Sequence, residues 1–144
     1  MKISARYLIS FLVSAFVLAF ALTWTPHIAN SQQTAPTKSV GTKSTKKQAV
    51  DLGPEIAGME GRQLRMRVNT IEPGGHGRIH NHKNRPAVAY ILQGTNTVTS
   101  EDGTVKVLRA GDTSFANKDT VHWSRNDGKE PLIFIVVDIY QEKK

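Results

Sequence analysis

Three histidines are spaced so that the strands of a small β-sheet protein could bring them to one metal ion. His80 and His82 form a His-x-His pair, and His122 lies much further along the chain. Side chains alternate along a strand with a period of two, so a His-x-His pair presents both imidazole rings on one face. A third imidazole from another strand would complete a set of nitrogen ligands suited to a divalent transition metal. The spacing therefore predicts a metal site, through which the protein does chemistry or binds a ligand.

Short alternating segments predict the strands that must position these histidines. Apolar residues recur at nearly every second position, and turns rich in Gly, Asp and Asn separate the segments. No segment has a convincing helical period. The predicted strands cover residues 63–71, 78–83, 87–93, 95–100, 105–108, 113–115, 122–126 and 132–140. Many short strands joined by tight turns indicate an all-β protein, an antiparallel barrel or sandwich.

The spacing of the histidines and glycines resembles the two motifs of the cupin family. The first cupin motif is Gly, five residues, His-x-His, three or four residues, Glu, six residues and Gly. Here Gly74 precedes His80-Asn-His82 by five residues, Ala87 follows after four, and Gly94 after six more. The second motif is Gly, five residues, Pro-x-Gly, two residues, His, three residues and Asn. Its counterparts here are Gly111, Asn117-Lys-Asp119, His122 and Asn126.

Two positions depart from the cupin pattern. Asn117 and Asp119 replace the Pro and Gly of a turn, and both residue types accept turn geometry. Ala87 stands where the family has its carboxylate ligand, and its methyl group cannot bind a metal. The resemblance therefore implies three protein ligands rather than four, in a double-stranded β-helix or jelly-roll barrel. It also implies one more coordination position open to water or a ligand.

The resemblance implies a divalent transition metal, with Fe, Mn, Ni, Cu and Zn all compatible with three neutral imidazoles. The alternative is a metal-free barrel in which the histidines are structural, and Ala87 favours that alternative. Three imidazoles kept in register favour the metal, because buried histidines need partners.

Five further residues are weaker candidates for contact with a substrate. Arg78 has the same strand parity as His80 and could hold a carboxylate, and Arg85 lies in the following loop. Ser124 and Asn126 share the parity of His122 and could orient a ligand. His76 could lie near the mouth of the barrel. A solvent-facing position is the alternative for Arg78, and a rim position that does not bind metal is the alternative for His76.

Arg65 and Arg67 alternate with Leu64, Met66 and Val68, so the two arginines share one face of their strand. We expect this face to be solvated, and secondarily to form a dimer contact.

The N-terminal part of the chain predicts export from the cytoplasm. Lys2 and Arg6 precede an uncharged apolar run over residues 7–24, the layout of an export signal. Residues 1–31 are therefore a signal peptide or, if uncleaved, a helical membrane anchor. Residues 32–49 are basic and polar, which predicts a disordered linker. The barrel domain is predicted over residues 50–144, outside the cytoplasm in the periplasm or beyond the cell.

Charge and composition exclude several classes of function. The net charge is +7, but residues 1–49 carry six basic and no acidic groups, while the remainder carries thirteen basic and twelve acidic groups. The predicted domain is therefore nearly neutral, and we expect no nucleic-acid partner. No cysteine is present, which excludes thiolate ligands and nucleophiles.

These observations predict an exported or membrane-tethered cupin that binds a divalent metal through His80, His82 and His122. It would be a metal-dependent enzyme of dioxygenase or isomerase type on a small molecule, or a non-catalytic module that binds a small ligand or metal. A structural barrel without metal is a third hypothesis. The resemblance also implies a possible homodimer.

Overall fold

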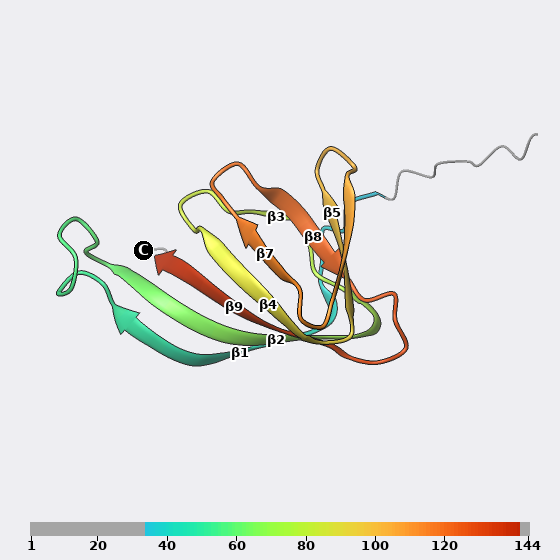
Figure 1. The fold of residues 1–144 in the computed structure, drawn as a ribbon. Coiled ribbons are helices and arrows are strands. Elements are labelled where there is room, and N and C mark those ends of the chain that lie inside the picture. The colour runs from blue at the N-terminus through green and yellow to red at the C-terminus, as the bar shows by residue number, and fades with distance from the viewer. Residues whose placement is uncertain (1–33, 142–144) are drawn as a thin grey trace, which may run out of the picture. The chain divides into compact units, whose positions relative to one another are not determined.

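The structure is a computed structural model that describes residues 34–141, and these residues form nine strands (Figure 1). Predictions for residues 1–31, including the export signal or anchor and its apolar helix, lie outside the described residues. Within residues 34–141 no helix is long and apolar enough to cross a membrane. The strands are β1 (Val40–Asp51), β2 (Arg62–His76), β3 (His80–Asn81), β4 (Ala87–Gln93), β5 (Thr95–Ser100), β6 (Val105–Arg109), β7 (Thr113–Ala116), β8 (Val121–Arg125) and β9 (Leu132–Gln141).

The strands form one antiparallel sheet that curls into a nearly closed barrel, in the order β6-β5-β8-β2-β9-β4-β7 (Figure 1). β1 pairs with β2, and the two-residue β3 pairs with β8. Strands distant in sequence thus become neighbours, as β9 lies between β2 and β4. The prediction of an all-β jelly-roll barrel is confirmed. The predicted strand over residues 78–83 is reduced to β3.

The core lies between the inner faces of β2, β4 and β9. Residues of β9 alternate between buried and half-buried, which places Leu132, Phe134, Val136 and Asp138 on the inner face. The core cluster is Ile71, Ala87, Ile91, Leu132, Phe134 and Val136. Four of these residues, Ile71, Ala87, Phe134 and Val136, are also in the wall of the cavity described below, so packing in the core fixes one side of the site.

β1 corrects the prediction of a disordered linker, which is wrong for residues 40–49. Nearly every side chain of β1 is exposed, so its sequence lacks the apolar alternation of a core strand. The strand instead pairs along its length with β2, and β-branched residues such as Thr42, Thr45 and Val50 suit this position. Backbone hydrogen bonds to the long strand β2 therefore hold β1 in place, although β1 buries little side-chain surface.

Candidate metal centre

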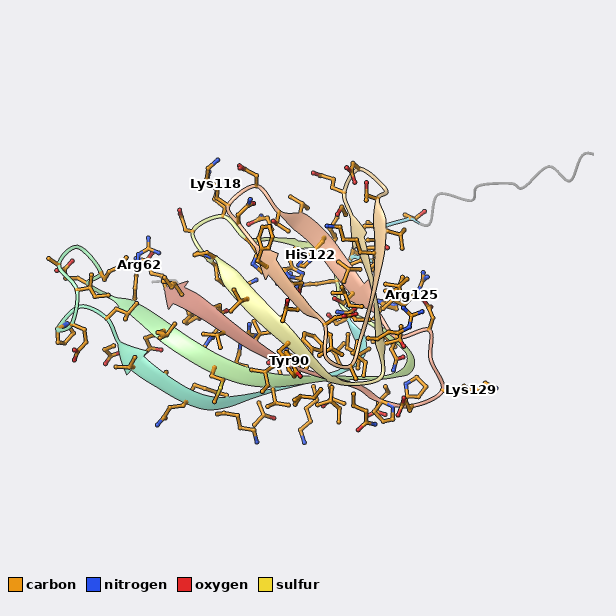
Figure 2. All side chains as sticks on the ribbon, in the orientation of Figure 1. Arg62, Tyr90, Lys118, His122, Arg125 and Lys129 are labelled. Atoms are coloured by element: carbon orange, nitrogen blue, oxygen red, sulfur yellow. The ribbon has the colours of Figure 1, made fainter. Side chains whose placement is uncertain are left out.

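His80, His82 and His122 come together because β3 pairs with β8. His80 is directly opposite His122 in the register of these strands, and His82 lies just beyond the end of β3. His82 is only 6% exposed, and the other two rings are half-buried. In Figure 2 the side chain of His122 lies inside the ring of strands, whereas Lys118 extends outward from the loop before β8. The predicted convergence of these three histidines is confirmed.

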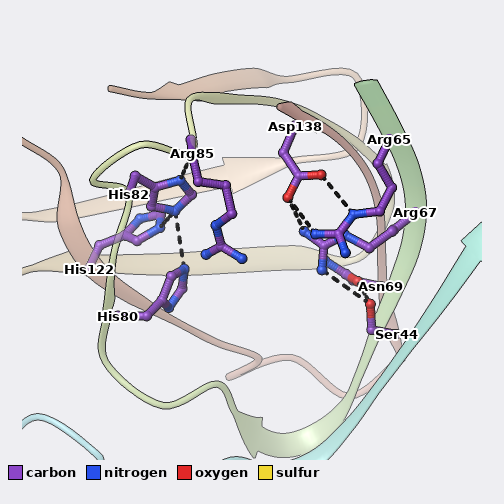
Figure 3. Close-up of polar contacts among 9 residues, drawn as sticks. All are labelled: Ser44, Arg65, Arg67, Asn69, His80, His82, Arg85, His122 and Asp138. Carbon is purple, nitrogen blue, oxygen red and sulfur yellow. Dashed lines mark hydrogen bonds and ion pairs between the residues drawn. The ribbon is translucent and has the colours of Figure 1, made fainter. Parts of the chain in front are cut away.

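The three rings present their Nε2 atoms to one another. Nε2 of His82 lies 3.2 Å from Nε2 of His80 and 3.1 Å from Nε2 of His122. The ring centroids are 4.9 to 5.0 Å apart in all three pairs. The rings therefore form a nearly equilateral cluster with one side of each ring turned to a common point (Figure 3).

Backbone carbonyl groups fix the protonation pattern of two of these rings. Nδ1 of His80 lies 3.1 Å from the carbonyl oxygen of Arg78, and Nδ1 of His82 lies 3.0 Å from that of Arg85. A carbonyl oxygen only accepts, so Nδ1 carries the proton in both rings. The neutral rings of His80 and His82 therefore turn unprotonated Nε2 lone pairs toward each other. Such a contact needs a cation between the lone pairs.

Burial keeps these imidazoles neutral. It lowers the pKa of His122 to about 4, with the neighbouring His80 and His82 as further causes. Burial also lowers the pKa of His80 and of His82, and the positive charge of Arg85 lowers the pKa of all three rings. At neutral pH the rings are therefore available as ligands, because a metal binds the unprotonated nitrogen.

The spacing of the nitrogens fits a divalent transition metal. Metal–imidazole distances are about 2.1 Å. With that length, nitrogen separations of 3.1 and 3.2 Å correspond to N–metal–N angles of about 95–100°. These angles lie between the right angles of one face of an octahedron and the about 109° of a tetrahedron. Three histidines at this spacing could hold one ion and leave its further coordination positions open.

The histidines lie in the wall of a cavity of about 300 Å³. Arg78, Arg85 and Ser124 also lie in this wall, where the sequence places its weaker candidates for substrate contact. Their predicted contact with a substrate stays a prediction.

Asn126 and His76 are not among the residues that line this cavity, and their predicted contact with a substrate stays a prediction. Asn126 is fully buried, and its amide group donates to the carbonyl oxygens of Ile71 and Glu130, both at 2.8 Å. Its Oδ1 accepts from the backbone N–H of Gly128. This side chain therefore holds the loop between β8 and β9. Because β8 ends at Arg125, the alternation of side chains along the strand does not extend to Asn126. His76 lies at the end of β2 opposite Arg125.

Arg65 and Arg67 face the interior, which corrects the prediction of a solvated face. Both bind the carboxylate of Asp138, which is 1% exposed. Leu64 and Met66 take the outer face of β2 and are 42% and 37% exposed. The sequence shows that two faces alternate, and the pairing of β2 with β9 decides which one is inside: Arg65 lies opposite Asp138.

These three charged residues form a cluster beside the cavity (Figure 3). Asp138 accepts from Arg65 at 3.1 and 2.9 Å and from Arg67 at 3.0 Å. Arg65 also lies over the ring of Tyr140, 3.7 Å from its centroid. The signal that could have revealed the cluster is an Asp at an inward position of an otherwise apolar strand, residues 132–140.

β1 supplies part of the cavity wall, which the sequence analysis missed because it treated this segment as a linker. Thr42, Lys43 and Ser44 line the cavity. The hydroxyl of Ser44 donates to Oδ1 of Asn69 at 2.6 Å and accepts from Arg67 at 3.4 Å. The strand therefore closes the site on the side of the charged cluster.

Comparison with known families decides the classification. The family model of the cupin domain matches residues 67–138, half of the chain. The chain belongs to the cupin family. No significant match is found among curated protein sequences. The matched segment spans the three histidines, their strands and Asp138.

Solved cupin structures share the fold at low sequence identity. KdgF from Halomonas sp. is 18% identical, with a TM-score of 0.55 over 71% of this chain and 82% of that one. A predicted oxalate decarboxylase from Thermotoga maritima is 19% identical, with a TM-score of 0.53 over 75% and 95%. The polyketide cyclase RemF from Streptomyces resistomycificus is 17% identical, with a TM-score of 0.58 over 76% and 72%. At this identity the similarity shows the fold alone.

The departures from the cupin motifs have different consequences in the structure. Oδ1 of Asn117 accepts from the N–H of Asp119 and from the hydroxyl of Thr120, so the altered turn before β8 still forms. Ala87 lies in the cavity wall on β4, between Ala116 of β7 and Asp138 of β9. The carboxylate that the motif places at this position is therefore missing from the site itself.

Proposed function

We propose that this cupin binds a divalent transition metal through His80, His82 and His122 and acts as a metal-dependent enzyme, of dioxygenase or isomerase type, on a small molecule. The observation that carries the proposal is the convergence of three Nε2 atoms, two pairs of which are 3.1 and 3.2 Å apart. Three neutral imidazoles are compatible with Fe, Mn, Ni, Cu or Zn, so the metal analysis below covers all five.

When bound, the metal would supply Lewis acidity or electron transfer at its open positions. The protein's own groups prepare this site. Carbonyl oxygens of Arg78 and Arg85 fix the ring orientations of His80 and His82, which raises the basicity of their free nitrogens. Ala87 leaves room beside the histidines, and the side chains of Ile71, Phe134 and Val136 give the cavity an apolar part of its wall.

A non-catalytic binding module is the second candidate. No Asp or Glu is among the residues that line the cavity within the described part of the chain. The cavity therefore offers no carboxylate as a general base, and proton transfer would depend on the substrate or on water. This observation favours a binder, or an enzyme whose chemistry needs no protein base.

Export remains part of the proposal and is supported by the basic and apolar pattern of residues 1–31. The near-neutral charge of residues 50–144 supports a small-molecule partner over nucleic acid. Homodimer formation is supported by exposed apolar side chains on β4 and β7, of which Phe115 is 76% exposed.

Metal analysis of the full-length protein tests the proposal. The protein is dialysed against Fe(II), Mn(II), Ni(II), Cu(II) or Zn(II), and bound metal is measured for the wild type, His82→Ala and His76→Gln. We expect one ion per chain in the wild type and in His76→Gln, whose side chain is outside the cavity. His82→Ala should retain almost none, because it removes the nitrogen nearest to both others. Equal metal content in His82→Ala and the wild type would contradict the proposal.

Oxygen uptake and substrate turnover by the metal-loaded protein then separate the two candidates. Turnover that is lost in His82→Ala supports the enzyme. Tight retention of a ligand without turnover supports the binding module.

A further inference from the structure

The cavity carries positive charge that the protein does not balance. Four of its lining residues are basic, and none is acidic within the described residues: Lys43, Arg67, Arg78 and Arg85. Asp138 lies beside the cavity, but it binds both Arg65 and Arg67 and can neutralise only one of them. A divalent ion on the histidines would add two further positive charges. A cavity with this charge is expected to bind an anionic ligand.

Arg85 is the cation best placed to bind a ligand. Within residues 34–141 its guanidinium group makes no hydrogen bond or ion pair. Figure 3 shows this group extending into the space between the histidines and the Asp138 cluster. Its backbone is fixed to a candidate metal ligand: the N–H of Arg85 donates to the carbonyl oxygen of His82 at 2.9 Å, and its own carbonyl accepts from Nδ1 of that residue. The guanidinium group is thus anchored beside the metal position and free to bind.

Other polar atoms in the same wall also lack partners. Nε of Arg67 is buried without a hydrogen bond among the described residues, although its two terminal nitrogens bind Ser44 and Asp138. Oδ1 of Asn96 is buried and unpartnered as well, and Asn96 is 4% exposed and lines the cavity. Buried polar atoms in folded proteins nearly always have partners, so unpaired ones in a cavity wall point to a bound molecule.

Position 87 provides the space for an anionic group. The methyl group of Ala87 lies in the wall where the cupin motif has a carboxylate, and the register places it opposite Asp138. Asp138 is already bound by two arginines and cannot serve in its place. Ile71, Phe134 and Val136 give the cavity an apolar side, which suits an organic body better than an inorganic ion.

We propose that the ligand of this cavity is a small organic carboxylate, whose carboxylate group binds Arg85 beside Ala87 and whose further oxygen reaches the metal. The contact with the metal rests on the function proposed above, whereas the contact with Arg85 does not. A planar guanidinium group binds a carboxylate through two parallel hydrogen bonds, so the arginine selects the carboxylate and the apolar side accommodates the remainder.

Calorimetric titration of the full-length protein loaded with Mn(II) tests this assignment. The probes are malonate, malate and benzoate, each paired with its neutral amide (malonamide, malamide or benzamide), together with inorganic phosphate. At least one carboxylate should bind at least tenfold more tightly than its amide and more tightly than phosphate. Arg85→Gln should weaken that binding at least tenfold, because a hydrogen-bonded charge pair is lost. Its metal content at neutral pH should be no lower, since the substitution keeps the backbone bonds of residue 85 to His82 and removes a positive charge near the cation.

Two further variants make the test specific. Arg109→Gln removes an exposed guanidinium group outside the cavity and should bind the probes like the wild type. Ala87→Glu places the motif's carboxylate in the site, so it should retain metal and lose the carboxylate probe.

Failure of the two proposals can be told apart. If the wild type retains no metal, the function proposed above fails, and titration of the metal-free protein still tests the contact between Arg85 and the carboxylate. The inference is overturned if no carboxylate binds, if an amide or phosphate binds as well as its carboxylate, or if Arg85→Gln binds like the wild type.

Discussion

Replacing Asp138 with Asn should strongly destabilise the barrel. Among the described residues, the Asp138 carboxylate is the only acidic group that pairs with the inward-facing Arg65 and Arg67. The substitution keeps the shape of the side chain and removes its charge. Oδ2 of Asp138 accepts from Arg65 at 2.9 Å and from Arg67 at 3.0 Å. An Asn side chain has one oxygen, so its NH₂ group would face a guanidinium N–H, and the two positive charges would lose their counterion.

The magnitude follows from the burial of the three side chains. Removing one partner of a fully buried ion pair costs about 3–5 kcal/mol. Asp138 is 1% exposed, but the side chains of Arg65 and Arg67 are 14% and 19% exposed, so water reaches the cations in part. We therefore expect the lower end, about 3 kcal/mol, which lowers Tm by roughly 10–20 °C in a domain of this size.

Urea denaturation of the full-length protein at pH 7 measures this loss. Asp119→Asn is the matched control, because its carboxylate is 71% exposed and pairs only with the 78% exposed Lys118. Exposed pairs contribute little, so this variant should stay within about 0.5 kcal/mol of the wild type. If Asp138→Asn is also within that range, the cluster does not stabilise the fold and our reading of the inward face of β2 is refuted.

Two further predictions concern the histidines and the loop after β8. The metal-free protein should lose stability as pH falls from about 6.5 to about 4, because the unfolded chain binds a proton on His122 before the folded chain does. This residue alone contributes about 3 kcal/mol over that range; urea denaturation in a chelator measures it, and an equally steep loss in His122→Gln would contradict the assignment. Asn126→Ala should cost about 3 kcal/mol, because it leaves buried backbone groups of Ile71, Gly128 and Glu130 unpaired. Its metal affinity should be unchanged in dialysis, and a loss of metal with unchanged stability would instead place Asn126 in the site.

The strands and the histidine cluster could be predicted because they follow local rules. Alternation with a period of two identifies segments such as residues 87–93 and 132–140, which correspond to β4 and β9. The same rule places His80 and His82 on one face. His122 lies opposite His80 only because β3 pairs with β8. The sequence does not reveal this register, so the prediction that the three histidines converge depended on the spacing of the two cupin motifs.

What the sequence could not reveal depends on pairing between distant strands. Alternation separates Arg65 and Arg67 from Leu64 and Met66 but does not say which pair is inside. Hydrophobicity favours the wrong answer, because an arginine is inside only when an acid on a neighbouring strand meets it. β1 was missed for a related reason: its stability comes from backbone pairing with β2, to which side-chain polarity is nearly irrelevant.

Ala87 shows how one residue supports opposite interpretations until the surroundings are known. Loss of a ligand carboxylate is what a decaying metal site would show, and it is also what an open site for an anionic ligand would show. A decaying site has no reason to keep Nδ1 of His80 and His82 bound to carbonyl oxygens, with their Nε2 atoms converging at 3.2 Å. It also has no reason to leave the guanidinium group of Arg85 in the adjoining space (Figure 3). The converging Nε2 lone pairs are unfavourable without a cation, and the unpaired guanidinium group of Arg85 is unfavourable without an anion. Binding of a metal ion together with an anionic ligand removes both costs. The charge that position 87 lacks is therefore best explained as a charge that the ligand brings.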